Sequence, residues 1–230
     1  MDLNGLVPVL PGRLLTDQAW LSERVEQTGR QFGCSQRRVS ATLWWYSASV
    51  VLLGPAVREL VRSAALVDLS PSTLRFTLLF NGYLDRVIPA VGPDNGALVD
   101  GPALGRHLDD VLGEIIGPLA RAGRASEQSL WAIAADSLAT RVLAETTASV
   151  PGPARAPELA TAIAQAGPRL RPLPRFVDVI ADPGAPVRRY VRRGSCCLLY
   201  RVPDGTCVSC PTQAPAERLE RLRQHARAMG

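Results

Sequence analysis

The longest uncharged run of the chain reads VSATLWWYSASVVLLGPAV, from Val39 to Val57. Its centre, Leu43 to Tyr46, is apolar nearly all round, which indicates a helix that is buried on several sides. A membrane-spanning helix needs about 20 mostly apolar residues, and this run contains serine, threonine, glycine and proline. We therefore expect a buried helix from Gln36 to about Arg62, with a break or kink near Pro55, and no stable membrane span.

Helical signals recur on both sides of this run, as apolar residues at helical spacing or as residues typical of helix ends. They predict helices over residues 17–31, 104–116, 126–146, 157–166 and 216–228. Residues 74–88 differ, because two short strand-like runs flank Asn81-Gly82, the strongest short signal for a β-hairpin. The sequence therefore predicts a mainly α-helical fold with a small β-hairpin or sheet element, of the α+β class.

The length and composition describe a globular chain. It has 230 residues, 47% of them hydrophobic and 20% charged, enough to bury a sizeable core. The start, Met1-Asp2-Leu3-Asn4, lacks the basic residues and the apolar stretch of a signal peptide. We therefore expect a cytoplasmic location, where clustered cysteines are more often metal-binding or redox-active than joined in disulfides.

The charge divides the chain unevenly. From Pro186 onward there are nine arginines and three acidic residues, a net charge of +6, whereas the remainder carries 17 basic and 18 acidic residues, a net charge of −1. The break Asp182-Pro183-Gly184-Ala185-Pro186 separates the two parts. It predicts a helical body over residues 1–185 and a cysteine-rich C-terminal segment over residues 186–230.

Four cysteines in that segment form the pattern C-C-x9-C-x2-C: Cys196, Cys197, Cys207 and Cys210. Structural zinc accepts four thiolates, but only the second pair has the usual knuckle spacing, and adjacent side chains in an extended chain point apart. A 2Fe–2S cluster also takes four thiolates and is wider than one ion. A thiol–disulfide redox site is the third alternative, although no βαβ unit precedes Cys207. The residues alone leave all three open.

The residues between the two cysteine pairs predict a short hairpin. Residues 198–202 resemble a strand, and Pro203 and Gly205 suit a turn that starts at Val202. Such a hairpin would bring both cysteine pairs to one end. Nearby arginines would lower the pKa of the thiols and offset the charge of a cluster; they are Arg188, Arg189, Arg192, Arg193 and Arg201.

The block RGSCCLLYRVPD, Arg193 to Asp204, followed by CVSCP, Cys207 to Pro211, resembles the C-terminal signature of the FhuF-type ferric siderophore reductases. Tyr200, Arg201 and Pro203 match the pattern between the cysteines. The family's usual interval between the pairs is ten residues, and here it is nine. A looser likeness extends to residues 129–138, where the family tends to have a helix that contains tryptophan.

The resemblance implies that Cys196, Cys197, Cys207 and Cys210 ligate a 2Fe–2S cluster. It implies an oxidoreductase that transfers one electron to siderophore-bound Fe(III) and so releases Fe(II). The expected partners are a ferric siderophore of the hydroxamate type, bound by the helical body, and an external electron donor such as a ferredoxin or a reductase. No catalytic residue beyond the ligands is assigned.

Two other functions remain as alternatives. One is a binding protein stapled by zinc, without redox activity; the other is an iron–sulfur DNA-binding regulator, although the sequence has no helix-turn-helix signal and we expect no nucleic-acid partner. Outside the cysteine segment, Cys34 is expected to be a buried structural thiol. Trp44, Trp45 and Trp131 are expected in the core rather than in a ligand platform.

Overall fold

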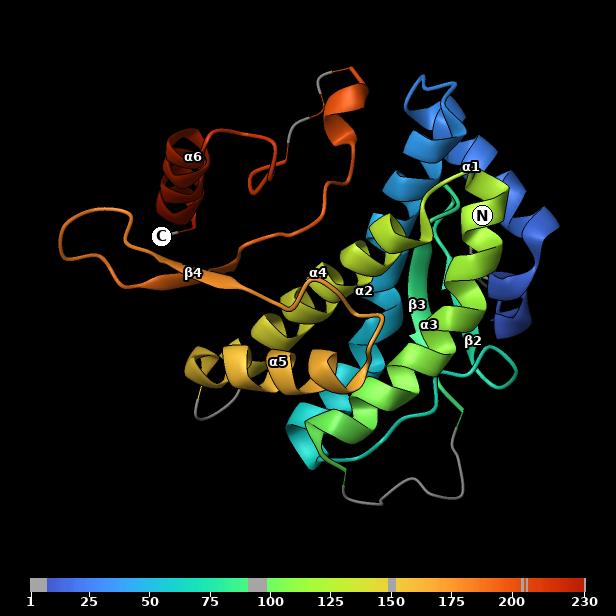
Figure 1. Ribbon diagram of the computed structural model, residues 1–230, viewed down its shortest axis with the longest axis horizontal. Coiled ribbons are helices and arrows are strands. Elements are labelled where there is room, and N and C mark those ends of the chain that lie inside the picture. Colours follow the sequence, from blue (N-terminus) through green and yellow to red (C-terminus); the bar gives the residue numbers. More distant parts are fainter. Residues whose placement is uncertain (1–7, 91–98, 149–151, 204, 206, 230) are drawn as a thin grey trace, which may run out of the picture.

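Six α-helices form most of the part of the chain that the computed structural model describes, which is residues 8–90, 99–148, 152–203, 205 and 207–229 (Figure 1). They are α1 (Gln18–Gln31), α2 (Arg37–Ser63), α3 (Gly101–Gly123), α4 (Glu127–Thr147), α5 (Ala156–Ala166) and α6 (Pro215–Ala228). Short 3-10 turns lie at η1 (Gly12–Thr16), η2 (Pro153–Arg155) and η3 (Leu199–Arg201). The prediction of a mainly α-helical fold with a small β element is confirmed.

Helix α2, which carries the long uncharged run, is the central helix and packs against α1, α3 and α4. Trp44 and Trp45 are fully buried, as predicted, and the indole N–H of Trp45 donates to the Leu130 carbonyl of α4 at 2.8 Å. Of the predicted break or kink near Pro55, the break is wrong, because α2 continues to Ser63. Proline inside a helix costs about 3 kcal/mol, and burial of α2 against three neighbouring helices offsets that cost.

Capping residues fix where three of the helices begin. Asp17 accepts a hydrogen bond from the Trp20 N–H at 2.8 Å, and Asp100 accepts one from the Ala103 N–H at 2.8 Å. Ser126 accepts one from Ser129. These contacts satisfy N–H groups that have no partner within the helix. The cap at Asp100 explains why α3 begins before the predicted residue 104.

Two small antiparallel sheets accompany the helices. The first contains β1 (Leu10–Pro11), β2 (Arg75–Leu78) and β3 (Leu84–Ile88), in the order β1-β2-β3. Its β2–β3 pair is the predicted hairpin, with Gly82 at φ 82° in the connecting loop. The second sheet pairs β4 (Phe176–Val179) with β5 (Arg188–Val191). The sequence analysis missed this pair, because both strands are short and prolines lie close to them.

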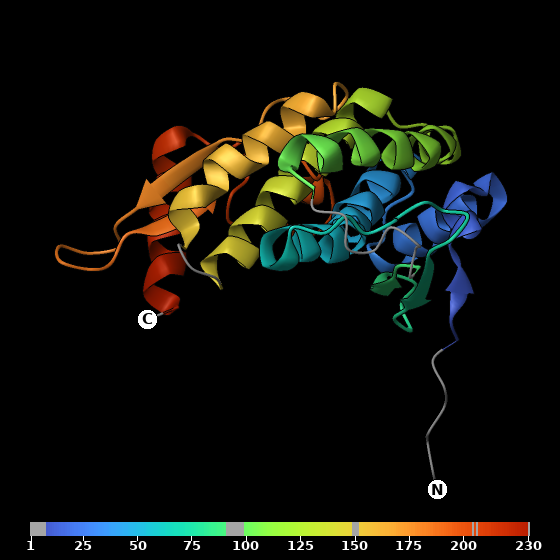
Figure 2. The same ribbon diagram turned by 90° about the horizontal axis from the view of Figure 1, so that it is seen from below.

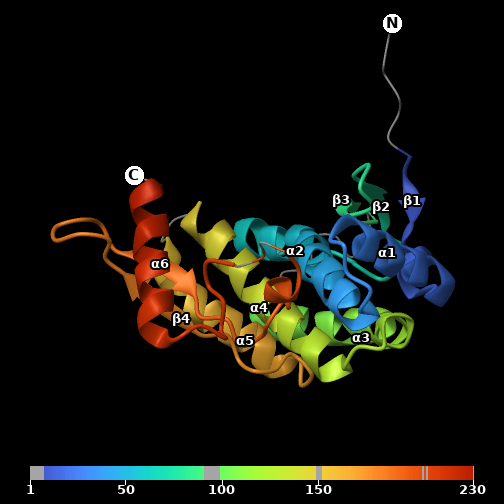
Figure 3. The same cartoon turned by 90° about the horizontal axis from the view of Figure 1, so that it is seen from above.

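The two sheets lie at opposite ends of the long axis of the molecule (Figures 1, 2 and 3). After β5 the chain crosses to the N-terminal end of α2, forms η3 there and returns to α6 beside β4 (Figure 1). The predicted boundary at residues 182–186 lies in the loop between β4 and β5. Both sides of that boundary thus contribute a strand to one sheet, and the division of the chain into two domains stays a prediction. No helix within the described ranges is both long enough and apolar enough to cross a membrane.

Candidate metal centre

We call residues 193–212 the cysteine loop, and Asp136 of α4 holds its first residues. The Asp136 carboxylate accepts hydrogen bonds from the Gly194 N–H at 3.0 Å, from the Ser195 N–H at 2.8 Å and from the Ser195 hydroxyl. Only 5% of Asp136 is exposed. A buried carboxylate is stable when donors satisfy its oxygens, so these three bonds fix the backbone immediately before Cys196.

The guanidinium of Arg193 is buried next to the cysteines. It lies over the Tyr46 ring, 4.3 Å from the ring centroid, and its Nε is 3.6 Å from Asp136 Oδ2. Its Nη1 approaches the Cys207 sulfur at 3.6 Å. One buried cation therefore faces a carboxylate and a thiol together.

The other arginines expected near the thiols have different surroundings. Arg189 forms a bidentate ion pair with Asp178, with both N–O distances 2.7 Å, and Arg192 is exposed. Arg201 lies over the ring of Tyr200, 5.2 Å from its centroid. Arg193 differs from these three, because its guanidinium approaches the sulfur of Cys207.

The chain bends sharply after the adjacent cysteine pair. Leu198 has φ 61° and ψ 14°, a left-handed conformation that costs a non-glycine residue about 1–2 kcal/mol. The strand predicted over residues 198–202 is wrong, because residues 199–201 form the 3-10 turn η3. The predicted turn at Val202 does have its hydrogen bond, from the Gly205 N–H to the Val202 carbonyl at 3.3 Å.

A small apolar cluster supports this bend. Val202 packs with Val39 and Leu43 of α2, and Leu198 and Leu199 lie against the same group. Burial of these side chains offsets the strain at Leu198, since each buried aliphatic side chain contributes about 1.5–3 kcal/mol. A local bend that depends on contacts with α2 is invisible in the spacing of the cysteines alone.

The sulfurs of Cys197 and Cys207 lie 3.9 Å apart. A disulfide needs about 2.05 Å, and both thiols are free. Two sulfurs on one tetrahedral metal, each about 2.3 Å from it, are about 3.8 Å apart. The pair therefore has the separation of two ligands of one metal ion, whether zinc or an iron of a cluster.

Each of the four sulfurs faces a hydrogen-bond donor close by in the sequence or the fold. The Leu198 N–H donates to the Cys196 sulfur at 3.4 Å, and the Thr212 hydroxyl lies 3.0 Å from the Cys210 sulfur. Arg193 approaches Cys207, and the Leu199 N–H faces Cys197. Hydrogen bonds to ligand sulfurs are one of the means by which proteins set the potential of iron–sulfur clusters.

The four thiols influence one another's ionisation. The Cys207 thiol lowers the pKa of Cys197 to about 5; burial opposes this effect, while the Leu199 N–H and Arg193 support it. The same contact, together with burial, raises the pKa of Cys207. Burial raises the pKa of Cys196, and so do Cys197 and Cys210. Burial also acts against ionisation of Cys210, but hydrogen bonds from Thr212 outweigh it and lower its pKa.

The structure thus brings all four predicted ligands into one loop, but it does not gather them around one point. Among the described residues, no group of three or more His, Cys, Asp or Glu side chains is placed to hold a metal ion. Cys196 and Cys210 are hydrogen-bonded to Leu198 and Thr212 instead. The number and type of donors fit a four-thiolate group, and the Cys197–Cys207 separation fits one edge of it.

Cys34 lies closer to this loop than its place in the sequence suggests. It is half-buried and belongs to the apolar cluster of Val39, Leu43 and Val202. Its thiol lies 3.9 Å from the Gln36 carbonyl. These surroundings are those of a packed structural thiol, as predicted, although it is less buried than expected.

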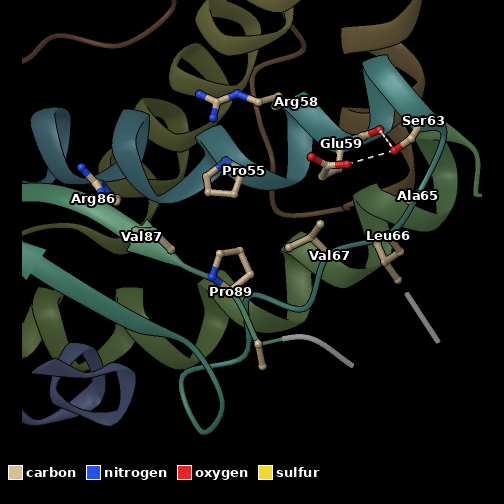
Figure 4. Close-up of a pocket in the computed structure, with 11 residues that line it drawn as sticks. Pro55, Arg58, Glu59, Ser63, Ala65, Leu66, Val67, Arg86, Val87 and Pro89 are labelled. Carbon is tan, nitrogen blue, oxygen red and sulfur yellow. Dashed lines mark hydrogen bonds between the residues drawn. The ribbon is translucent and has the colours of Figure 1, made fainter. Parts of the chain in front are cut away.

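A separate cavity lies at the other end of α2. It has a volume of about 800 Å³, and Pro55, Arg58 and Glu59 of α2 line it together with Arg86 and Val87 of β3 (Figure 4). From Thr42, near the cysteine loop, to Arg58 the helix rises by about 24 Å. A ligand in that cavity would therefore be remote from the four thiols.

A smaller cavity of about 340 Å³ adjoins the cysteines. Cys196 and Arg201 of the cysteine loop line it, with Arg38 of α2 and Ser129 of α4. Sequence analysis did not anticipate a hollow at this place. Its walls come from three segments that are far apart in the chain, so no local pattern encodes it.

Asp136 and Tyr46 are the residues of this site that the sequence analysis did not single out. The sequence could have indicated Asp136, because it is the one charged residue between Glu127 and Arg141. A lone acid on a buried face usually has a specific partner. No such indication exists for Tyr46, since an aromatic residue in an apolar run usually lies in the core.

No protein-family model and no curated protein matches this chain. The resemblance to FhuF-type reductases rests on the sequence from Arg193 to Pro211.

Proposed function

We propose that this chain is a cytoplasmic 2Fe–2S ferric siderophore reductase, with Cys196, Cys197, Cys207 and Cys210 as ligands. The observation that carries the proposal is the cysteine loop itself. Four thiols lie in one loop, each faces a hydrogen-bond donor, and the buried Arg193 lies beside two of them. These features suit a negatively charged group that must change its charge by one.

When bound, a 2Fe–2S cluster takes up and gives away one electron at a time. The residues around it would supply position and charge. Asp136 fixes the backbone before Cys196, and Arg193 offsets the added negative charge. Val202 and Leu43 exclude water from the α2 side of the loop.

The reaction balances as a single electron transfer. The chelated Fe(III) gains one electron and becomes Fe(II), and the electron comes from an external one-electron donor such as a reduced ferredoxin. The hydroxamate oxygens take up protons from water as the metal leaves. Hard oxygen ligands hold the less charged Fe(II) far more weakly than Fe(III), so reduction favours release.

The charge of the C-terminal segment supports an acidic electron donor. Residues 186–230 carry a net charge of +6, and complementary charge speeds the encounter of two proteins. The rate of electron transfer from a ferredoxin should therefore fall as ionic strength rises.

A zinc-stapled binding protein without redox activity is the second candidate. The 3.9 Å separation of Cys197 and Cys207 suits zinc as well as iron. In that case the zinc-bound cysteine loop would hold α2, α4 and α6 together and would have a structural role alone.

A ferrous-trap assay tests the proposed reaction. Anaerobically purified protein is given a reduced ferredoxin and a panel of ferric siderophores, and a strong Fe(II) chelator reports release. We expect release that depends on the protein and is lost in Cys210→Ser but kept in Cys34→Ser. Equal rates with the wild type and Cys210→Ser would contradict the proposal.

A further inference from the structure

Two neighbouring cavities lie along the first turns of α4, and we call them together the groove beside Cys196. The cavity of about 340 Å³ next to the cysteines and a second of about 650 Å³ share Ser129 and Ala132 in their walls. The second is also lined by Trp131 of α4 and by Arg169 and Arg171. Ligand pockets usually measure about 300–1,000 Å³, so the two together have room for a small metal chelate.

Arginines line both cavities of the groove. Arg38 and Arg201 line the first cavity and Arg169 and Arg171 the second, and no Asp or Glu is among the described residues that line either. The cavity of about 800 Å³ at the other end of α2 differs, since Glu59 lines it. A concave surface of one sign with apolar walls concentrates ligands of the opposite charge.

Two of the four arginines are held in place by the protein itself. Arg169 pairs with Asp109 at 2.8 Å and lies over the Trp131 ring, 4.7 Å from its centroid. Arg171 donates to main-chain carbonyls, among them that of Ala164 at 2.7 Å. The charge of Arg169 is therefore largely neutralised, and both side chains act mainly as walls.

Arg38 and Arg201 have charges that remain available to a ligand. Neither forms an ion pair within the described part of the chain, and both are exposed. They come from α2 and from η3 and line the same cavity. Two arginines that line one cavity, together with Ser126 and Ser129, suit carboxylate oxygens.

Of the four predicted ligands, Cys196 lies at the wall of this groove. It is half-buried and lines the first cavity, whereas Cys197 and Cys210 are buried and line neither cavity of the groove. A ligand in the groove would therefore lie against the Cys196 side of the site. A chelate with excess negative charge would be repelled by a four-thiolate group, and Arg38 and Arg201 would offset that repulsion.

We propose that this groove docks ferric chelates of net negative charge, of the kind made by hydroxamate siderophores that also carry free carboxylates, with Arg38 and Arg201 as the residues that select them. The inference rests on the proposed function and adds the docking site and the substrate class. It predicts discrimination against cationic trihydroxamate complexes.

Binding of Ga(III) complexes tests the docking site without any redox step, because Ga(III) is not reduced under these conditions. Isothermal titration of the purified holoprotein would compare the Ga(III) complex of a citrate-based dihydroxamate, which is anionic, with that of desferrioxamine B, which is cationic. We expect tighter binding of the anionic complex, and affinity for it that falls with added salt. The double variant Arg38→Gln/Arg201→Gln should weaken that binding on the order of tenfold.

Arg86→Gln is the matched control, since Arg86 is exposed, forms no ion pair within the described residues and lines the cavity of about 800 Å³ at the other end of α2 instead. It should leave both affinities within about twofold. Equal binding of the two complexes, or a loss in Arg86→Gln without a loss in the double variant, would overturn the inference. If these binding results appear in a protein that contains a 2Fe–2S cluster, they refute the docking site but not the proposed reaction. A protein that contains zinc instead of the cluster would refute the proposed reaction.

Discussion

Ser195 donates to Asp136 through both its main-chain N–H and its hydroxyl, and so ties the cysteine loop to the buried face of α4. The same carboxylate lies 3.6 Å from the buried guanidinium of Arg193. Position and charge of the loop thus depend on one acidic residue. Removing one member of a buried charge pair leaves the other uncompensated, which costs about 3–5 kcal/mol.

Asp136→Asn should therefore destabilise the protein by about 3 kcal/mol and weaken retention of the bound metal. The amide keeps the shape and one acceptor oxygen but loses the charge. Denaturant unfolding and metal analysis after gel filtration would measure both effects. Asp110→Asn, at an exposed position of α3, should change stability by less than about 0.5 kcal/mol. A fully stable, metal-replete Asp136→Asn protein would contradict this role.

Arg193→Gln should lower the reduction potential of the bound cluster. The buried cation favours the more negative, reduced state, and losing about 1–2 kcal/mol of that interaction corresponds to about 40–90 mV for one electron. Spectroelectrochemical titration would measure the shift. Arg192→Gln removes the neighbouring exposed charge and should have a much smaller effect, because water screens it. A higher potential in Arg193→Gln would refute the assignment.

In the metal-free protein the thiol of Cys197 should react as a thiolate well below neutral pH. Its pKa is lowered to about 5, first by the Cys207 thiol and then by the Leu199 N–H and Arg193. A lowered pKa means that the thiolate exists above about pH 5, so alkylation should rise through pH 5 and level off before pH 7 rather than rise through pH 8–9. Mass spectrometry of iodoacetamide-treated Cys34→Ser protein would follow the rate at Cys197.

Arg193→Gln supplies the internal comparison for that experiment. Without the guanidinium the alkylation profile should move to higher pH, since a nearby cation favours the thiolate. An unchanged profile would show that Arg193 does not act on the Cys197–Cys207 pair.

Much of the helical fold can be predicted from the sequence because its signals are local. Asp17 and Ser126 mark helix starts by side-chain caps that act within one turn. The Asn81-Gly82 hairpin is local in the same way. The long burial of α2 could be inferred because its uncharged run leaves no polar face.

The cysteine loop shows why the rest could not be predicted. Spacing identified the four thiols, but the path between them depends on contacts of Val202 with Leu43 and of Ser195 with Asp136, each across more than 50 residues. Residues 198–202 resemble a strand in sequence, yet residues 199–201 form η3, because Leu198, Leu199 and Val202 pack in the apolar cluster at α2. The groove beside Cys196 depends on three segments and has no signature in any one of them.

Ala64 offers a test of the fold that is independent of the metal. It ends α2 in a left-handed conformation, with φ 52°, which glycine adopts without strain. Ala64→Gly should stabilise the protein by about 0.5–1 kcal/mol, whereas Ala162→Gly, inside α5, should destabilise it by about 1 kcal/mol. Thermal or urea unfolding would measure both, and a destabilised Ala64→Gly would contradict the described end of α2.

The identity of the bound group is measured most directly by the visible and electron paramagnetic resonance spectra of anaerobically purified protein, with iron, zinc and acid-labile sulfide analysed on the same sample. The proposed function predicts a coloured protein with about two iron and two sulfide per chain and a paramagnetic signal after one-electron reduction. The colour, the iron and sulfide, and the paramagnetic signal should be lost in Cys210→Ser but kept in Cys34→Ser. A colourless protein that contains one zinc and no sulfide would contradict it.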